Sequence, residues 1–326
     1  MSKKNIEIGV IGAGSIGSLF GGYLAAIESK IYDIRVILFG RKKHMDAINE
    51  HGLIIEKEGQ TKTIKNIKTR ETSENLSIIF DYLFITTKTY DLKNVLAQYQ
   101  TLIDTCKYLI ILQNGIGNEV LVKQFCSEDK IIRAVTINGV FLDKPGHLIY
   151  SGEGLTKIGF PFNRLKKAEQ RNIDLLLLKD LLDTASLNTI LVDDIIKECW
   201  EKAFINIGIN AFGALTRLKN GQLLEINGLK DLMAEAISES LLVAKQKGIE
   251  VSDKDYITLT YEIAKKTAEN KNSMLQDVLK GKNTEIGFLN GIIVDYAKEL
   301  GISVPINDLL TKLIKGLEQS IKKGDI

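Results

Sequence analysis

The chain has 326 residues, more than one ordinary hydrophobic core holds, which indicates two domains. Its 43 basic and 41 acidic residues are spread along the whole chain and give a net charge of +2. Nucleic acid is therefore not expected as a partner, because proteins that bind polyanions segregate their positive charge. With 44% hydrophobic residues and 3 prolines, the composition is that of a soluble globular protein and excludes extensive disorder.

The N-terminus, the cysteines and the histidines indicate where the protein is located and whether it has disulfides or a metal site. No signal-peptide core follows Met1, and no apolar stretch reaches the roughly 18 residues of a membrane span, so we expect a cytoplasmic protein without a membrane partner. Cys106, Cys126 and Cys199 are too scattered for a disulfide framework or a zinc site and are expected in the core. The 3 histidines show no ligand spacing either, so no metal is expected.

The first half of the chain alternates short β-rich runs with helical patterns, which predicts a doubly wound parallel sheet of the Rossmann type in an α/β fold. The expected strands are 6–11, 34–39, 81–86, 108–112, 131–137 and 189–192. The expected helices are 17–28, 44–51 and 175–187. Residues 53–69 alternate apolar and polar side chains around Glu58-Gly59, which predicts an antiparallel hairpin added to this sheet. Residues 146–160 return to a β pattern, which predicts further strands that complete the same sheet.

Strand signals stop after Asp193, and the rest of the chain has helical periodicity. The expected helices cover 195–215, 228–247, 256–269, 285–300 and 309–322. We therefore predict a Rossmann-type dinucleotide-binding domain over residues 1–193 and a C-terminal all-helical domain over residues 194–326.

A glycine-rich turn lies between the first expected strand and the first expected helix. Its G-x-G-x-x-G pattern consists of Gly12, Ala13, Gly14, Ser15, Ile16 and Gly17. In such a turn the glycines permit the tight bend, the approach of a pyrophosphate and close packing of helix on strand. The helix N-terminus then offers N–H groups and partial positive charge to the phosphates. A glycine turn that binds nothing is the alternative, but the complete strand–turn–helix context favours a dinucleotide.

The residues after the second strand distinguish the two nicotinamide dinucleotides. An NAD site places Asp or Glu there to accept the ribose 2′-hydroxyl. This chain instead has Arg41, which can pair with a 2′-phosphate in a fork, and Lys42, which can assist. A solvated basic turn is the alternative. The position favours NADPH.

The expected helix over 195–215 carries a polar stripe. Lys202, Asn206 and Asn210 are spaced i, i+4 and i+8 and therefore share one face. The other positions are apolar almost all the way round, which is typical of a buried helix. Because buried polar groups cost free energy unless they are paired, one cation and two amides suit a small anionic ligand that bears a hydroxyl. A narrow solvent-exposed seam is the alternative.

Five further motifs lie along the chain. They are Thr87-Lys88-Thr89-Tyr90-Asp91, Leu112-Gln113-Asn114-Gly115-Ile116-Gly117, Asn220-Gly221, Ser273-Met274-Leu275-Gln276-Asp277 and Thr284-Glu285-Ile286. With these motifs in this order, the chain resembles the ketopantoate reductase (2-dehydropantoate 2-reductase) family from the glycine turn to near the C-terminus. The resemblance implies NADPH-dependent reduction of a small-molecule 2-keto acid, ketopantoate, to pantoate in the pantothenate and coenzyme A pathway. We expect a monomer or a homodimer.

The resemblance also implies roles for single residues. Lys202 looks like the general acid that protonates the C2 oxygen, and Glu285 like the carboxylate that contacts cofactor and substrate and orients the lysine. The positions that resemble the family's substrate-binding residues are Lys202, Asn206, Asn210, Asn220, Asn270 and Ser273. Lys88 and Asn114 match cofactor contacts at the carboxyl ends of strands. From its position alone, Glu285 would instead be a first-turn carboxylate of a helix that Thr284 caps.

The chain departs from the family at Gly287, where an acidic residue is usual, and over residues 137–140, which lack the usual Thr/His-rich pattern. Three alternative functions are compatible with the sequence. One is an NADPH-dependent reductase of another branched 2-keto acid. Another is a non-catalytic NADPH-binding sensor, against which Lys202 and Glu285 argue. The last is a 3-hydroxyacid-type dehydrogenase, which Arg41 and the pair Asn206 and Asn210 fit less well.

Overall fold

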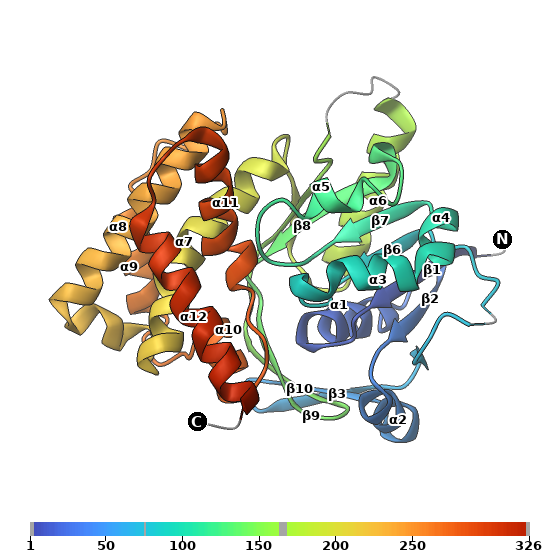
Figure 1. Ribbon diagram of the computed structural model, residues 1–326. Coiled ribbons are helices and arrows are strands. Elements are labelled where there is room, and N and C mark those ends of the chain that lie inside the picture. The colour runs from blue at the N-terminus through green and yellow to red at the C-terminus, as the bar shows by residue number, and fades with distance from the viewer. Residues whose placement is uncertain (1–2, 75, 163–167, 324–326) are drawn as a thin grey trace. The chain divides into compact units, whose positions relative to one another are not determined.

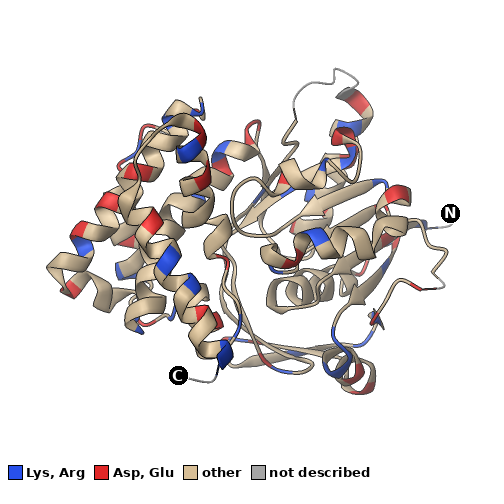
Figure 2. Ribbon diagram, viewed as in Figure 1, with Lys and Arg blue, Asp and Glu red and all other residues tan. Residues whose placement is uncertain are grey.

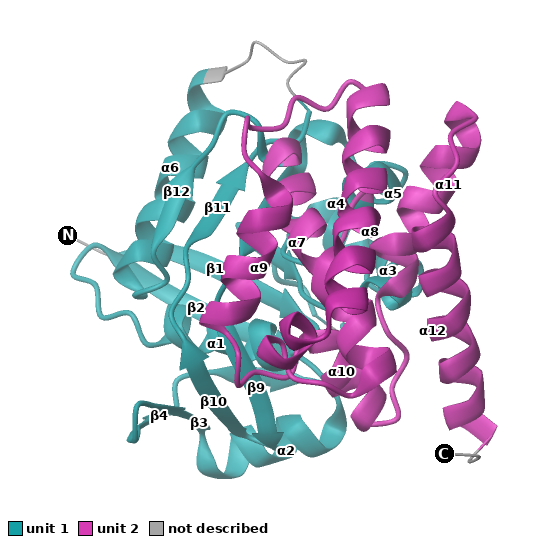
Figure 3. Ribbon diagram, turned by 90° about the vertical axis from the view of Figure 1, so that its left-hand side faces the viewer, with its two compact units in different colours: residues 1–113, 118–195 teal, residues 114–117, 196–326 magenta. Residues whose placement is uncertain are grey.

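The computed structural model describes residues 3–74, 76–162 and 168–323 (Figure 1). The chain divides into two compact units, which Figure 3 colours separately. Unit 1 contains residues 1–113 and 118–195, and unit 2 contains residues 114–117 and 196–326. The loop 114–117 thus groups with the C-terminal helices, although its neighbours in sequence belong to unit 1.

Unit 1 is built on an eight-stranded sheet in the order β12-β11-β8-β7-β6-β1-β2-β5. The strands are β1 (Lys4–Ile11), β2 (Tyr32–Phe39), β5 (Lys68–Arg70), β6 (Tyr82–Ile85), β7 (Tyr108–Ile111), β8 (Ile131–Thr136), β11 (Thr156–Gly159) and β12 (Thr189–Leu191). All neighbouring strands are parallel except β8 and β11. Every residue of β6, β7 and β8 is buried, as expected of parallel strands covered on both faces. The predicted Rossmann-type class is confirmed.

The hairpin at residues 53–64 does not join this sheet. The strands β3 (Leu53–Lys57) and β4 (Gln60–Ile64) pair antiparallel, as predicted. With β9 (Gly139–Lys144) and β10 (His147–Gly152), however, they form a separate four-stranded sheet in the order β4-β3-β10-β9. The prediction that 53–69 and 146–160 extend a single sheet was therefore wrong, since only β5 and β11 from those segments join the main sheet.

The first helix, α1, buries apolar side chains on two sides, and the second sheet packs against one of them. Eight of the 11 residues of α1 (Ser15–Ala25) are buried. Its glycines allow close contact on both sides: a Cβ at Gly22 would lie 2.6 Å from Leu53 Cδ2 of the second sheet, and one at Gly21 would clash with Leu38 of β2. Leu53 and Leu38 belong to one hydrophobic cluster, so α1 is packed between the two sheets.

Unit 1 contains further helices and short helical turns. They are α2 (Lys42–His51), η1 (Thr89–Asp91), α3 (Leu92–Gln98), α4 (Gln100–Thr105), α5 (Asn118–Val122), η2 (Glu128–Lys130) and α6 (Ala168–Thr184).

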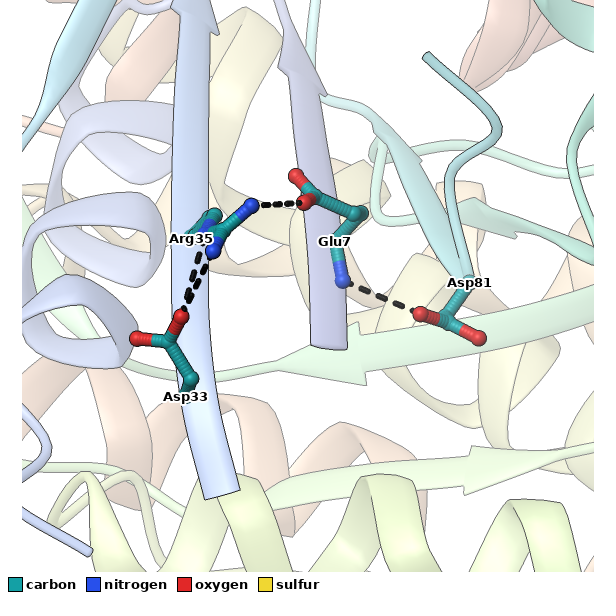
Figure 4. Close-up of polar contacts among 4 residues, drawn as sticks. All are labelled: Glu7, Asp33, Arg35 and Asp81. Atoms are coloured by element: carbon teal, nitrogen blue, oxygen red, sulfur yellow. Dashed lines mark hydrogen bonds and ion pairs between the residues drawn. The ribbon is translucent and has the colours of Figure 1, made fainter. Parts of the chain in front are cut away.

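Near the amino ends of β1, β2 and β6, a cluster of charged residues connects the three strands (Figure 4). Arg35 donates to Asp33 at 2.8 Å and to Glu7 at 3.3 Å, and the Glu7 N–H donates to Asp81 Oδ2 at 3.0 Å. The glycine turn follows β1 at the opposite, carboxyl end of the strand.

Unit 2 consists of helices around its own hydrophobic core. They are α7 (Ile195–Thr216), η3 (Gly221–Glu225), α8 (Asn227–Gln246), α9 (Tyr256–Lys266), α10 (Ser273–Leu279), η4 (Ile286–Phe288), α11 (Asn290–Leu300) and α12 (Pro305–Lys323). Trp200, Phe204 and Ile207 place α7 in that core, which confirms that it is a buried helix. Acidic and basic residues both lie along the other helices, as Figure 2 shows for α8 and α12. None of the described helices is long and apolar enough to cross a membrane.

The predicted helix over 285–300 is interrupted. Glu285 precedes the short turn η4, and α11 begins only at Asn290, because Leu289 has the non-helical angles φ −116° and ψ −95°. Asn290 is fully buried and its Nδ2 donates to Asn307 Oδ1 of α12 at 3.0 Å, a contact that holds the new helix start. Glu285 is therefore not a first-turn residue of a long helix.

Candidate active site

The glycine turn of unit 1 is held between the carboxyl ends of β2 and β6. Gly12 has φ +95°, and a Cβ there would lie 2.6 Å from the backbone nitrogen of Thr87. The N–H groups of Gly12 and Ala13 both donate to the carbonyl of Phe39, at 3.0 and 2.9 Å. The hydroxyl of Thr86, the residue after β6, donates to the Gly12 carbonyl at 2.7 Å. Only glycine fits position 12, and the turn is rigidly placed.

Beyond this turn, the start of α1 presents its backbone to open space. A Cβ at Gly14 would find only the Gly12 carbonyl oxygen, at 3.9 Å. No side chain of the described residues caps α1 at Gly14, so the first-turn N–H groups are offered to an external acceptor. Ser15 Oγ accepts from the Leu142 N–H at 3.0 Å, and Ile16 packs against the core. This backbone arrangement fits the pyrophosphate of a dinucleotide.

The two basic residues after β2 differ in their surroundings. Arg41 precedes α2 and is exposed. Lys42 is also exposed, but its ammonium lies 3.4 Å from carboxylate oxygens of both Asp46 and Glu71. Those two carboxylates raise the pKa of Lys42 and offset its charge. Arg41 is therefore the better placed of the two to bind an anion.

Lys88 and Gln113 follow the adjacent strands β6 and β7. Lys88 is half-buried and immediately precedes η1. Gln113 Nε2 donates to the Thr87 carbonyl at 2.7 Å and to its hydroxyl at 3.2 Å. The buried amide of Gln113 thus ties the segment before Lys88 to the end of β7. The sequence motif contains Gln113, but its positioning contact was not predicted.

In unit 2 a chain of hydrogen bonds joins three residues that are far apart in the sequence. Lys202 Nζ donates to Asn114 Oδ1 at 2.7 Å, and Asn114 Nδ2 is 3.3 Å from Glu285 Oε2. Glu285 is 5% exposed and Lys202 is half-buried. A cation and a buried carboxylate are therefore linked through one amide, an arrangement that suits proton donation by the lysine.

Asn114 reaches this position because its loop packs on η4. The Ile116 N–H donates to the carbonyl of Phe288 at 3.2 Å. Gly115 has φ +91°, and a Cβ there would lie 2.7 Å from the same carbonyl oxygen. The glycine is thus required for the close approach of the two segments.

Asn114 and Glu285 also line a pocket. Its lining residues are Asn114, Asn210, Ser273, Met274, Asp277, Glu285 and Leu289. Asn272 explains why Ser273 lies near Asn210: its Oδ1 accepts from the Leu275 N–H at 2.9 Å and caps α10, while its Nδ2 is 3.4 Å from the Ile209 carbonyl of α7. The predicted residues Asn114, Asn210, Ser273 and Glu285 are therefore brought together, and Lys202 contacts one of them.

The remaining predicted residues do not line this pocket. Asn206 is half-buried on α7, one turn from both Lys202 and Asn210. Asn220 donates from its backbone to the Asn270 carbonyl at 3.0 Å and from Nδ2 to Thr267 Oγ1 at 2.9 Å. Asn220 is 7% exposed, yet its Oδ1 has no hydrogen-bond partner among the described residues. A buried acceptor of this kind fits a ligand hydroxyl.

Two carboxylates, one in the pocket and one next to Lys202 in the sequence, were not assigned roles from the sequence. Asp277 lines the pocket one turn after Ser273 on α10, a helix that was not predicted. Glu201, next to Lys202, accepts from the Ser252 N–H at 3.0 Å and lies 3.2 Å from Lys254 Nζ. Burial opposes the ionisation of Glu201, but these bonds outweigh it and lower its pKa to about 2. The i, i+4 spacing of Ser273 and Asp277 was the available sequence signal.

Comparison with known proteins identifies the family. The family described as ketopantoate reductase PanE/ApbA matches residues 8–161, and its C-terminal region matches residues 194–318. The chain belongs to the ketopantoate reductase PanE/ApbA family. The resemblance predicted from the motifs is thus confirmed, and the chain is an NAD(P)-dependent oxidoreductase.

Similar proteins span the whole chain. The 2-dehydropantoate 2-reductase of Pyrococcus horikoshii is 36% identical over 315 residues, covering 96% of this chain and 98% of the relative. The structure of a PanE/ApbA family ketopantoate reductase from Ralstonia eutropha JMP134 has a TM-score of 0.85 at 26% identity and covers 97% of this chain and 100% of that one. D-mandelate dehydrogenase in complex with NADH has a TM-score of 0.83 at 26% identity, with the same coverage. The α/β and helical classes of the two parts are therefore those of this ketopantoate reductase family.

Proposed function

We propose that the chain is a 2-dehydropantoate 2-reductase, which reduces the ketone of ketopantoate to the alcohol of pantoate with NADPH. The observation that carries this proposal is the hydrogen-bonded chain from Lys202 through Asn114 to Glu285 beside a polar pocket. The name of the Pyrococcus horikoshii relative supports the substrate.

NADPH, when bound, supplies the hydride. The uncapped N–H groups in the first turn of α1 would hold its pyrophosphate, for which Gly12 shapes the turn and Gly14 leaves room, and the exposed guanidinium of Arg41 would pair with its 2′-phosphate. Lys88, at the end of β6, would contact the same cofactor. This choice over NADH rests on Arg41, because a carboxylate after β2 would repel the extra phosphate.

Lys202 is the proposed general acid. Reduction of a ketone builds negative charge on its oxygen, and an ammonium close to that oxygen stabilises the charge and donates a proton to it. The bond from Nζ to Asn114 Oδ1 directs the ammonium, and Glu285 fixes the amide of Asn114 from its other side. Glu285 would also contact substrate and cofactor, as the family resemblance implies.

Unit 2 offers partners for both polar ends of ketopantoate, of which only Asn210 and Ser273 line the pocket. Asn210 and Ser273 line it together and can donate to a carboxylate, with Asn206 one turn away on α7. The free Oδ1 of Asn220 can accept from a hydroxyl, and the adjacent Asn270 completes this side. An analogue that lacks the hydroxyl would leave a buried acceptor unpaired.

The test compares two substrates at saturating NADPH. Ketopantoate carries a terminal hydroxyl that 2-ketoisovalerate lacks, while both have a carboxylate and a branched carbon. We expect kcat/KM to favour ketopantoate strongly, since loss of a bonded hydroxyl costs up to about 10⁴-fold in sites built for it. Similar values for the two acids would contradict the assignment.

A reductase of another 2-keto acid is the second candidate, because D-mandelate dehydrogenase shares the fold and Gly287 replaces the family's acidic residue with open space. Including phenylglyoxylate, the 2-keto acid that corresponds to mandelate, distinguishes this candidate. A kcat/KM for phenylglyoxylate above that for ketopantoate would favour it.

A further inference from the structure

A second arginine, Arg70, lies at the carboxyl ends of the sheet strands, on the strand next to the one that Arg41 follows. The strand β5 runs parallel to β2 and ends at Arg70, whose register partner is Phe39. The Gly40 N–H donates to the Arg70 carbonyl at 3.0 Å, and the Phe39 carbonyl accepts from the glycine turn. The glycine turn and Arg41 follow β1 and β2, and Arg70 is the last residue of β5. All three therefore lie at the carboxyl ends of neighbouring parallel strands, where ligands of doubly wound folds bind.

The side chain of Arg70 lies on the face of the sheet opposite α2. Thr69 Oγ1 donates to Asn49 Oδ1 of α2 at 2.7 Å, so Thr69 faces that helix. Successive strand residues point to opposite faces, which directs Arg70 to the side where Phe39 packs edge-on against Tyr99 at 5.4 Å. Arg70 is exposed at the end of this edge strand.

The basic residues at these strand ends differ in whether a carboxylate already binds them. The ammonium of Lys42 is shared between Asp46 and Glu71, each at 3.4 Å. Among the residues that the structure describes, neither Arg41 nor Arg70 has an ion pair or a hydrogen bond to its guanidinium. Neighbouring strands are about 4.8 Å apart, so two arginine side chains from these positions can converge on one phosphate.

We propose that Arg70 is a second binding residue for the 2′-phosphate of NADPH and shares this anion with Arg41. This inference rests on the proposed use of NADPH. Two guanidinium groups around one phosphate provide fork-like, charge-assisted hydrogen bonds, which a lysine already paired with two carboxylates provides less well.

The test measures binding and not turnover. The Kd values of NADPH and NADH, which differ only in the 2′-phosphate, are determined by calorimetric titration for the wild type and for Arg70→Gln. We expect the Kd of NADPH to rise about tenfold in the variant and that of NADH to stay within about twofold, as for a lost charged hydrogen bond.

Lys68→Gln is the matched control. It removes the same charge from the same strand and face, about 6.6 Å further from the strand end, and should leave both Kd values unchanged. An equal loss in Lys68→Gln would indicate a general charge effect and overturn the proposal. Equal weakening of NADPH and NADH by Arg70→Gln would place Arg70 on the adenine or the ribose and would also overturn it.

Wild-type affinities and the Arg41→Ala variant separate the role of Arg70 from the use of NADPH. A wild type that binds NADH as tightly as NADPH would refute the cofactor assignment and, with it, the role of Arg70. If Arg41→Ala weakens NADPH selectively while Arg70→Gln has no effect, the cofactor assignment stands and only the role of Arg70 is wrong.

Discussion

The glycine turn of unit 1 and the Lys202 site of unit 2 are built in different ways. The turn uses the backbone: positive φ at Gly12, the open side of Gly14 and the N–H groups of a helix start, all within six residues. The Lys202 site uses side chains, and its hydrogen bonds join residues 88 and 171 positions apart. A site made of backbone is visible as a short motif, whereas one made of side chains depends on how distant segments pack.

The two sites are therefore expected to respond differently to substitution. Changes at Lys202 or Asn114 should reduce chemistry without much loss of stability, because both side chains are half-buried and neither belongs to the hydrophobic core. Changes in the turn should affect the fold or cofactor binding, because the backbone itself is the binding surface.

The largest effect is expected at Lys202. Lys202→Ala removes the proposed general acid and should lower kcat at least about 10²-fold, with little change in the Kd of NADPH. Steady-state kinetics and a binding titration measure the two quantities. Lys266→Ala, an exposed lysine on α9, is the control and should retain full kcat. Turnover near the wild-type value in Lys202→Ala would mean that another group or water donates the proton.

A smaller loss is expected at Asn114. Asn114→Ala removes the amide between Lys202 and Glu285, and a hydrogen bond to a charged group contributes about 1.5–3 kcal/mol. We expect kcat to fall about tenfold or more. Thermal unfolding monitored in parallel should show nearly the wild-type Tm; a large drop in Tm would show that the residue holds the loop and not the lysine.

The two glycines of the turn should separate stability from binding. Gly12→Ala should lower the free energy of unfolding by about 1–3 kcal/mol, because of φ +95° and the contact with Thr87. Gly14→Ala meets open space at φ −87° and should fold normally but bind NADPH more weakly. Chemical denaturation and cofactor titration of both variants check this. Equal destabilisation by the two changes would contradict the backbone model of the turn.

The smallest effect concerns His44, which is buried behind the turn. Its Nδ1 accepts from the Gly146 N–H at 2.8 Å and its Nε2 is 2.9 Å from Ser18 Oγ, so the ring is neutral with its proton on Nε2. Burial lowers the pKa of His44 below the ordinary 6.5. The unfolded chain therefore takes up a proton first, and the stability that His44 contributes is present above pH 6.5 and decreases as the pH falls below it.

His44→Gln should reduce this pH dependence. The expected result is a smaller fall in Tm between pH 7 and pH 5 than in the wild type, together with a lower Tm at pH 7 from the lost hydrogen bonds. His51→Gln, at an exposed histidine, is the control and should leave the pH dependence of Tm unchanged. A wild-type pH dependence in His44→Gln would show that other groups produce it.

The sequence alone determined the features that depend on neighbouring residues. Alternating apolar runs predicted the parallel sheet, the G-x-G-x-x-G spacing predicted the turn, and the i, i+4, i+8 stripe placed Lys202 and Asn210 on one side of a buried helix. Each of these follows from backbone geometry over a few residues, which fixes the direction of every side chain relative to its neighbours.

Only the tertiary structure decided the features that depend on distant partners. The hairpin at 53–64 pairs with β10 and not with the main sheet because α1 needs cover on its second side. The helix break at Leu289 and the packing of the Asn114 loop on η4 bring Glu285 and Asn114 together. Periodicity states that a face is apolar or polar, but the partner of that face is chosen by complementary packing between segments far apart in the chain.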